Sequence, residues 1–173
     1  MTEKPLYERD PAEWRAKLVE GNATQPRKRV SADLLIRDTH GRVLLVDPVY
    51  KPDWDIPGGM AEANEPPNAA AQRELAEELG LSITPGRVLC VDWVAPHGPW
   101  DDLLAFIFDG GQLATAEAAQ LSLRDGELSA AEFCSIDQAR QRLRPYVFNR
   151  LQAALAAAET GTAQYLVNGC APV

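Results

Sequence analysis

Short apolar runs separated by turn-forming residues dominate the middle of this chain. Runs that are rich in aliphatic and β-branched side chains and bounded by Gly, Pro, Asp or Asn predict β-strands. The strands that we expect cover residues 30–36, 42–46, 87–94, 103–108 and 131–134. The first two flank a turn that contains Asp38, His40 and Gly41, so they are predicted to form an antiparallel hairpin with His40 exposed to solvent.

Helical periodicity is clearest over residues 66–79. Ala71, Leu75 and Leu79 follow the i, i+4, i+8 spacing of one helix face. The two prolines at the start of this segment suit the first turn of a helix, and Gly80 suits a left-handed C-cap. We therefore predict an amphipathic helix that begins at the prolines and ends before Gly80.

The remaining periodic segments flank this central part. A helix is predicted over 12–20, with Asp10 as its cap and Gly21 as its stop. Two more are predicted over 136–143 and 145–159, whereas 110–121 reads as a loop that can hold one helical turn. The chain is thus expected to divide into an N-terminal helix and linker (1–29), one domain (30–159) and a loose C-terminal tail (160–173).

Composition agrees with a single globular domain inside the cell. The chain has 173 residues, of which 46% are hydrophobic and 24% are charged. Its net charge of -8 excludes a broad nucleic-acid surface, and no apolar stretch is long enough for a signal peptide or a membrane span. Cys90, Cys134 and Cys170 are odd in number and lack a CxxC spacing, which predicts reduced thiols and a cytoplasmic location.

Candidate chemistry lies on the polar face of the helix at 66–79. Glu74, Glu77 and Glu78 fall on one face about one turn deep, where like charges repel one another. A divalent cation removes this repulsion. Oxygen ligands of this kind suit Mg²⁺ or Mn²⁺, whereas Zn²⁺ would call for His or Cys, and neither occurs in the stretch.

Residues 56–59, just before this helix, read as a short strand that runs into a glycine loop. A glycine lets its backbone carbonyl and amide approach a ligand or a metal without obstruction by a Cβ atom, and we expect this of Gly59. Arg73 lies slightly off the carboxylate face of the helix. We predict that it pairs with Glu65 in the preceding loop.

Together these residues match the motif of a known family. Gly59, Glu65, Arg73-Glu74-Leu75, Glu77-Glu78 and Gly80-Leu81 stand at spacings that are similar to a complete Nudix box over 59–81. The resemblance implies an α/β fold of the Nudix type. This is an α/β/α sandwich with a mixed β-sheet, the box helix on one face and the C-terminal helix on the other.

The resemblance also implies roles for individual residues in metal-assisted hydrolysis of a phosphoanhydride. The metal ligands would be Glu74, Glu77 and Glu78, with the carbonyl of Gly59. Arg73 would orient Glu74 and Glu77, while Glu65 and Gly80 would be structural. Glu127 matches by its context a family glutamate in the loop before the last strand, although Glu117, Asp125 and Glu132 compete for that place. Three carboxylates are then open as the catalytic base: Glu74, Glu78 and Glu127.

Two loops are predicted to bind substrate. The loop at 47–53 contains Tyr50, and Trp54 directly follows this loop. Trp54 could equally belong to the core or stack on a base. The connector at 95–102 offers His97 and Trp100. The basic run at 27–29, Arg27, Lys28 and Arg29, reads as a solvated cluster or as a contact to substrate or to a partner subunit, so a homodimer is also open.

The substrate class follows from the resemblance alone. Nudix hydrolases cleave nucleoside diphosphates linked to another group, and Pro96, 15 residues after Leu81, is similar to the proline of ADP-ribose pyrophosphatases. A small-molecule nucleotide, ADP-ribose or a similar nucleotide sugar, is therefore favoured. The alternatives are a (deoxy)nucleoside triphosphate pyrophosphohydrolase and a non-hydrolytic nucleotide-binding module. An isomerase on this scaffold would call for a cysteine near the first strands, whereas Cys90 follows the box.

Overall fold

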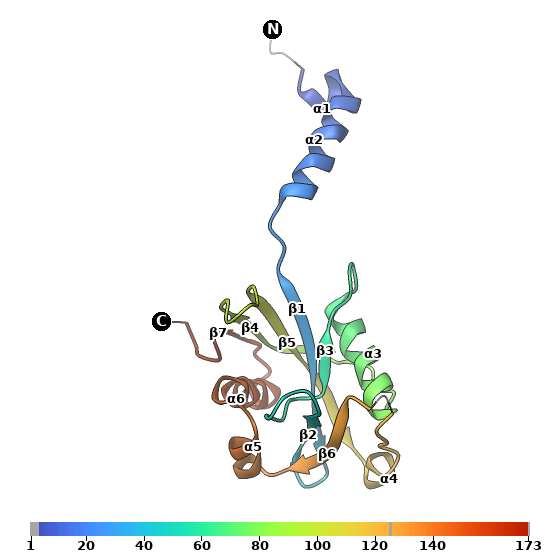
Figure 1. Ribbon diagram of the computed structural model, residues 1–173, viewed down its shortest axis with the longest axis vertical. Helices are drawn as coiled ribbons and strands as arrows, with labels where there is room; N and C mark the ends of the chain where they lie inside the picture. Colours follow the sequence, from blue (N-terminus) through green and yellow to red (C-terminus); the bar gives the residue numbers. More distant parts are fainter. Residues whose placement is uncertain (1–3, 125, 173) are drawn as a thin grey trace.

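A mixed β-sheet forms the centre of the domain (Figure 1). The structure is a computed structural model that describes residues 4–124 and 126–172. Over these residues the sheet has seven strands: β1 (Arg29–Asp38), β2 (Val43–Pro48), β3 (Gly58–Met60), β4 (Val88–Val94), β5 (Leu103–Leu113), β6 (Leu128–Cys134) and β7 (Gln164–Val167). The strand order is β6-β2-β1-β5-β4-β7, and β3 pairs with β1 off this path. The β1–β5 and β4–β7 pairs are parallel, whereas the other pairs are antiparallel.

The predicted hairpin and the other predicted strands are confirmed, although β6, expected over 131–134, already begins at Leu128. Two further differences concern β5 and β3. β5 continues through Gly110 to Leu113, where a loop was expected, because its backbone keeps pairing with β1 as far as Asp38. The helical turn expected after it is α4 (Thr115–Ala118). The second difference is at Gly58 and Gly59, which pair with β1 as strand β3 and do not form an open loop.

Helices cover both faces of this sheet, as predicted. One face carries α3 (Pro67–Leu79), whose Leu75 and Leu79 are fully buried against side chains of β1 and β2. The other face carries α5 (Ile136–Arg142) and α6 (Pro145–Thr160), with Leu151 in the core there. β1 is buried on both sides because consecutive residues, Leu34 and Leu35, enter opposite cores.

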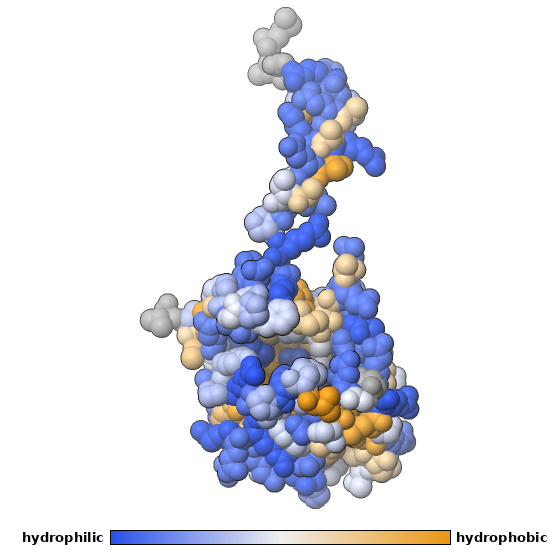
Figure 2. Space-filling model, viewed as in Figure 1, coloured by the Kyte–Doolittle hydropathy of each residue, from blue (hydrophilic) through white to orange (hydrophobic). Residues whose placement is uncertain are grey.

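The N-terminal segment forms an arm that projects away from the domain (Figure 1). It holds α1 (Leu6–Arg9) and α2 (Pro11–Thr24), and Asp10 caps α2 through the N–H groups of Ala12 and Glu13, as predicted for this cap. The predicted stop at Gly21 is wrong. The helix continues to Thr24 because a single exposed glycine weakens a helix by only about 1 kcal/mol. Figure 2 shows apolar side chains exposed on the arm among polar ones. The large exposed hydrophobic residues there are Tyr7 in α1 and Trp14, Leu18 and Val19 in α2.

The tail is the clearest departure from expectation. Residues 160–173 were predicted to be loose, but residues 164–167 form β7, which pairs in parallel with β4 along Cys90 to Trp93. The Asn168 N–H then donates to the Trp93 carbonyl at 2.9 Å, and the Val167 N–H donates to the Cys170 carbonyl at 2.8 Å. The prediction fails because the pairing partner lies more than 70 residues earlier in the chain, where no local pattern can indicate it. Among the described residues, no helix is both long and apolar enough to cross a membrane.

Candidate active site

Helix α3, which carries Glu74, Glu77 and Glu78, packs against strand β3. A Cβ atom added to Gly59 would stand 2.5 Å from the carboxyl carbon of Glu74, so any side chain at this position would displace that carboxylate. Glu78 is buried at 7% exposure, while Glu77 lies at the surface. Pro67 begins the helix and Gly80 ends it in the left-handed conformation with φ 66°, as predicted, so the three glutamates are held on one turn.

Arg73 organises the carboxylates around it. Its guanidinium binds Glu65 through two hydrogen bonds, both 3.0 Å long, which confirms the predicted pair. One of its nitrogens also donates to Glu74 at 3.0 Å and to Glu77 at 3.1 Å. The hydrogen bonds from Arg73 and from the Glu62 N–H lower the pKa of Glu65 to about 2. Arg73 therefore links the loop before α3 to the carboxylate face of the helix.

These donors fit a hard divalent cation by type. Glu74, Glu77 and Glu78 offer only oxygen, and the backbone of Gly59 can add a carbonyl. Among the residues that the structure describes, no three acidic, His or Cys side chains already converge on a single metal position. Arg73 binds one oxygen of Glu74 and one of Glu77, so the second oxygen of each carboxylate can face a cation while the pairing with Arg73 is kept. The side chain of Glu77 is 56% exposed.

Glu127, in the bend before β6, lies near enough to Glu74 for its charge to act on that carboxylate. Burial raises the pKa of Glu74, and the charges of Glu77 and Glu127 add to the rise. The competing residues are engaged elsewhere: Glu117 accepts the N–H of Ala114, and Glu132 pairs with Arg142 at 2.7 Å. Asp125 lies outside the described residues.

A cavity of 310 Å³ opens beside strand β3. Figure 2 shows the hollow in this face of the domain below the arm. The cavity is lined by charged residues and by aromatic rings: Arg29, Asp33, Lys51, Asp55 and Arg150, with Tyr50, Trp100 and Tyr146. Gly58 and Gly59 form part of the same wall, so the cavity adjoins the strand that packs against Glu74 of α3.

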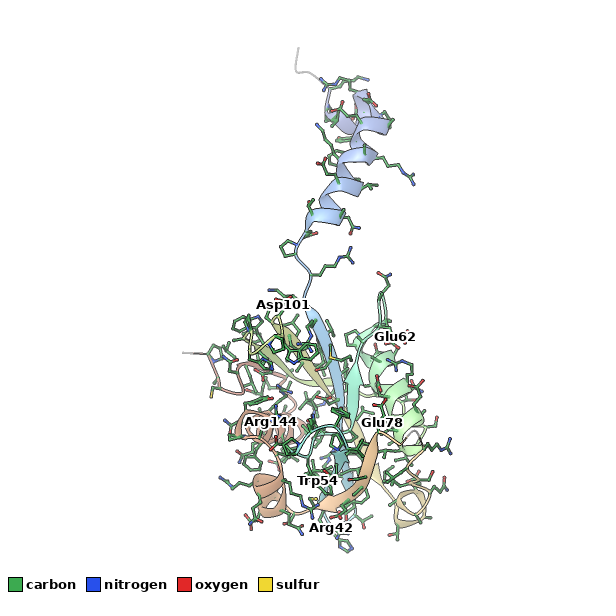
Figure 3. All side chains as sticks on the ribbon, in the orientation of Figure 1. Arg42, Trp54, Glu62, Glu78, Asp101 and Arg144 are labelled. Atoms are coloured by element: carbon green, nitrogen blue, oxygen red, sulfur yellow. The ribbon has the colours of Figure 1, made fainter. Side chains whose placement is uncertain are left out.

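Of the predicted substrate residues, the structure brings Tyr50, His97 and Trp100 together around this cavity. Burial raises the pKa of Tyr50, and the carboxylates of Glu78 and Glu127 add to that rise. Trp54 is not among the residues that line the cavity. Trp54, labelled in Figure 3, packs against the core. The guanidinium of Arg142 lies 4.1 Å from the centre of its ring.

The basic run of the linker holds the connector that carries His97 and Trp100. Lys28 pairs with Asp102, whose carboxylate also accepts the indole N–H of Trp93 at 2.8 Å. Both hydrogen bonds lower the pKa of Asp102. The guanidinium of Arg29 lies 4.5 Å from the ring centre of Trp100 and donates to the Asp101 carbonyl at 3.3 Å. Two of the three basic residues therefore fix one wall of the cavity.

Asp33 is a cavity residue that the sequence reasoning missed. Its side chain lies on β1, is buried at 7% exposure and is 4.0 Å from a guanidinium nitrogen of Arg150. Burial raises the pKa of Asp33 to about 8, and the neighbouring charge of Asp55 adds to the rise. A lone aspartate inside an apolar strand is the signal that could have indicated it.

Comparison with known proteins identifies first the fold of this chain and then its family. The fold is shared with an ADP-ribose pyrophosphatase from Streptococcus suis (19% identity, 82% of this chain and 99% of that chain, TM-score 0.56). It is also shared with a UDP-X diphosphatase (18% identity, 90% of this chain and 74% of that chain, TM-score 0.66). These likenesses define the fold. A NUDIX domain model matches residues 27–153, and the chain therefore belongs to the Nudix hydrolase family.

Sequence likeness to curated proteins is confined to a shorter stretch. The 8-oxo-dGTP diphosphatase of Proteus vulgaris is 39% identical over 54 residues, which cover 29% of this chain and 48% of that protein. The match thus spans about half the length of that relative.

Proposed function

We propose that this protein is a metal-dependent hydrolase that cleaves the phosphoanhydride bond of a nucleoside diphosphate linked to another group. One observation carries the proposal: the backbone of Gly59 is packed against the Glu74 carboxylate at the edge of a 310 Å³ cavity. This observation supports a site for a metal-bound diphosphate next to a space that can hold the rest of a nucleotide.

The metal proposed for this site is Mg²⁺, with Mn²⁺ as the alternative. The residues that would hold it are Glu74, Glu77 and Glu78, with the carbonyl of Gly59. When bound, such an ion supplies charge neutralisation for the diphosphate and lowers the pKa of water. The donor set supports this choice because every atom in it is oxygen.

The remaining steps belong to the chain's own residues. Arg73 positions the Glu74 and Glu77 carboxylates through its hydrogen bonds. A carboxylate then accepts the proton of the attacking water, and the three candidates are Glu74, Glu78 and Glu127. The raised pKa of Glu74 supports it in this role, because a more basic carboxylate is a better proton acceptor. Tyr50, His97 and Trp100 would contact the part of the substrate beyond the diphosphate.

For the substrate itself, we favour ADP-ribose or a similar nucleotide sugar. Pro96 supports this choice, as does the fold shared with an ADP-ribose pyrophosphatase and a UDP-X diphosphatase. A nucleoside triphosphate is the second candidate, and the local identity to an 8-oxo-dGTP diphosphatase supports it. The free cysteines support a cytoplasmic location, and the exposed hydrophobic side chains of the arm support a homodimer.

A substrate panel tests the proposal. Nucleotide sugars, nucleoside triphosphates, dinucleoside polyphosphates and coenzymes are each assayed with and without Mg²⁺, and kcat/KM is measured for every compound. We expect hydrolysis only with the metal, and the highest kcat/KM for a nucleotide sugar. A preference for triphosphates would reject the favoured substrate and leave the hydrolase standing. No turnover of any compound with Mg²⁺ or Mn²⁺ would reject the hydrolase.

Substitution of Arg73 by Ala tests its positioning role. We expect kcat to fall by about 10- to 100-fold because an outer partner that orients the ligands is lost. The affinity for Mg²⁺, measured by activity as a function of metal concentration, should weaken in parallel. Arg73→Lys, which keeps the charge but cannot bind Glu65 through two bonds, should restore only part of the affinity. An Mg²⁺ dependence equal to that of the wild type in Arg73→Ala would contradict the positioning role.

A further inference from the structure

A second cavity of 270 Å³ adjoins the first one. Its wall is made by the end of β4, the connector, the start of α6 and the tail: Val94, Ala95, Pro96, His97, Arg144, Tyr146 and Asn168. Val94, His97 and Tyr146 also line the main cavity, so the two spaces share a wall. Gly58 and Gly59, which lie next to α3, line the main cavity and not the second one. In Figure 3, Arg144 of the second cavity lies on the opposite side of this face from Glu78.

The two cavities differ in chemistry. The main cavity contains five charged side chains, which suit phosphates and sugar hydroxyls: Arg29, Asp33, Lys51, Asp55 and Arg150. The second cavity contains aliphatic groups, the ring of Tyr146 and a single formal charge on Arg144. That charge is held in place, because Arg144 donates to the Asp53 carboxylate at 2.6 Å and to the Tyr146 hydroxyl at 3.4 Å. Apolar walls with a few fixed polar groups are typical of sites for planar rings.

The tail is built to hold Asn168 at this cavity. Asn168 has φ 52°, a conformation that is uncommon outside glycine. Its side-chain oxygen accepts the Ala95 N–H at 2.8 Å and so fixes the start of the connector. Gly169, the next residue, has room for no side chain, because a Cβ atom there would stand 2.5 Å from the Tyr146 carbonyl oxygen. Its N–H donates to the buried carboxylate of Asp92 at 3.0 Å.

We propose that the second cavity binds the nucleobase of the substrate, a planar heteroaromatic ring with hydrogen-bond acceptors on its edge. The Tyr146 ring and the aliphatic wall contact its faces. The Arg144 guanidinium and the Asn168 amide are donors for its ring nitrogens or exocyclic oxygens. The main cavity then holds the sugar and phosphates, so the base lies past Tyr146 and away from the exposed ring of Trp100. The assignment rests on the proposed function, since it takes the ligand to be a nucleotide.

The test measures how much the base contributes to binding. ADP and ribose 5-diphosphate, which is ADP without adenine, are titrated calorimetrically into the full chain without divalent metal. The Kd of ribose 5-diphosphate divided by the Kd of ADP measures the contribution of the base to binding. We expect Arg144→Gln, and separately Ala95→Leu, which fills the cavity, to lower this ratio by about tenfold. The Kd of ribose 5-diphosphate should stay within about twofold. Asp53→Asn is the matched control, because its amide oxygen can still accept the hydrogen bond from Arg144 while the ion pair is lost, so it should keep the ratio.

Each outcome decides the assignment. A wild-type protein that binds ADP no more tightly than ribose 5-diphosphate would overturn it. The assignment would also be overturned if the ratio fell in Trp100→Ala but stayed at the wild-type value in both Arg144→Gln and Ala95→Leu. The base would then lie at the mouth of the main cavity. An equal fall in Asp53→Asn and Arg144→Gln, with no fall in Ala95→Leu, would also overturn it. Failure of hydrolysis in the substrate panel, with the base contribution and its pattern retained, would reject the proposed reaction and leave the base site standing.

Discussion

Replacement of Glu78 by Gln is expected to lower kcat by about 10³-fold and to leave the fold intact. Glu78 is buried on the face of α3 that also carries Glu74, so its carboxylate can serve a cation without competition from bulk water. Glutamine has the same shape but lacks the charge. Loss of one charged ligand from a metal site removes several kcal/mol of transition-state stabilisation, which corresponds to that fall in rate.

The rate should be measured at saturating Mg²⁺ with the best substrate of the panel. Glu77→Gln is expected to act in the same direction with a smaller effect, because its side chain is more exposed. Glu13→Gln, on the exposed arm, is the matched control and should turn over like the wild type. Circular dichroism and the melting temperature establish that the variants fold. Near-normal turnover by both Glu78→Gln and Glu77→Gln would reject the proposed metal site.

Arg150→Met is expected to lower the free energy of unfolding by about 3–5 kcal/mol. Arg150 is 4% exposed and binds Asp92, which is fully buried, through two hydrogen bonds of 3.1 and 3.0 Å. The substitution leaves the Asp92 carboxylate buried without its cation. The remaining donor, the N–H of Gly169, belongs to the tail and cannot neutralise the charge.

Urea unfolding of the wild type and the variant measures this difference. Arg15→Met, on an exposed position of α2, is the control and should change stability by less than about 0.5 kcal/mol. The double variant Arg150→Met, Asp92→Leu should regain much of the loss, because it removes both charges together. A loss below about 1 kcal/mol in Arg150→Met would show that the pair does not hold the tail and α6 to the sheet.

Much of the fold and of the carboxylate face of α3 could be predicted, because it depends on residue types and spacings within short stretches of the sequence. Prolines at the start of α3 and Gly80 at its end define that helix, because each residue type is tied to one backbone conformation. The pairing of Arg73 with Glu65 was predictable for the same reason, since the two residues are only eight positions apart. Spacing alone is enough where the interacting groups share one helix or one turn.

The parts that could not be predicted depend on contacts between distant segments. β7 has four residues and finds its partner in β4, so no period within the tail reveals it. Trp54 was open to two roles, and the choice between them depends on Arg142, which lies on α5 and covers the ring. Asp33 becomes a cavity residue only when α6 brings Arg150 to it. Tertiary packing decides each of these cases.

The three cysteines differ in exposure, and the exposed one lies close in sequence to the second cavity. Cys90 and Cys134 are buried, and burial raises the pKa of Cys90 to about 12, which keeps it protonated and unreactive at neutral pH. Cys170 is exposed and lies two residues after Asn168. A maleimide fluorophore will therefore attach at Cys170 in the folded wild-type chain. It will place an optical reporter beside the second cavity without any engineered substitution.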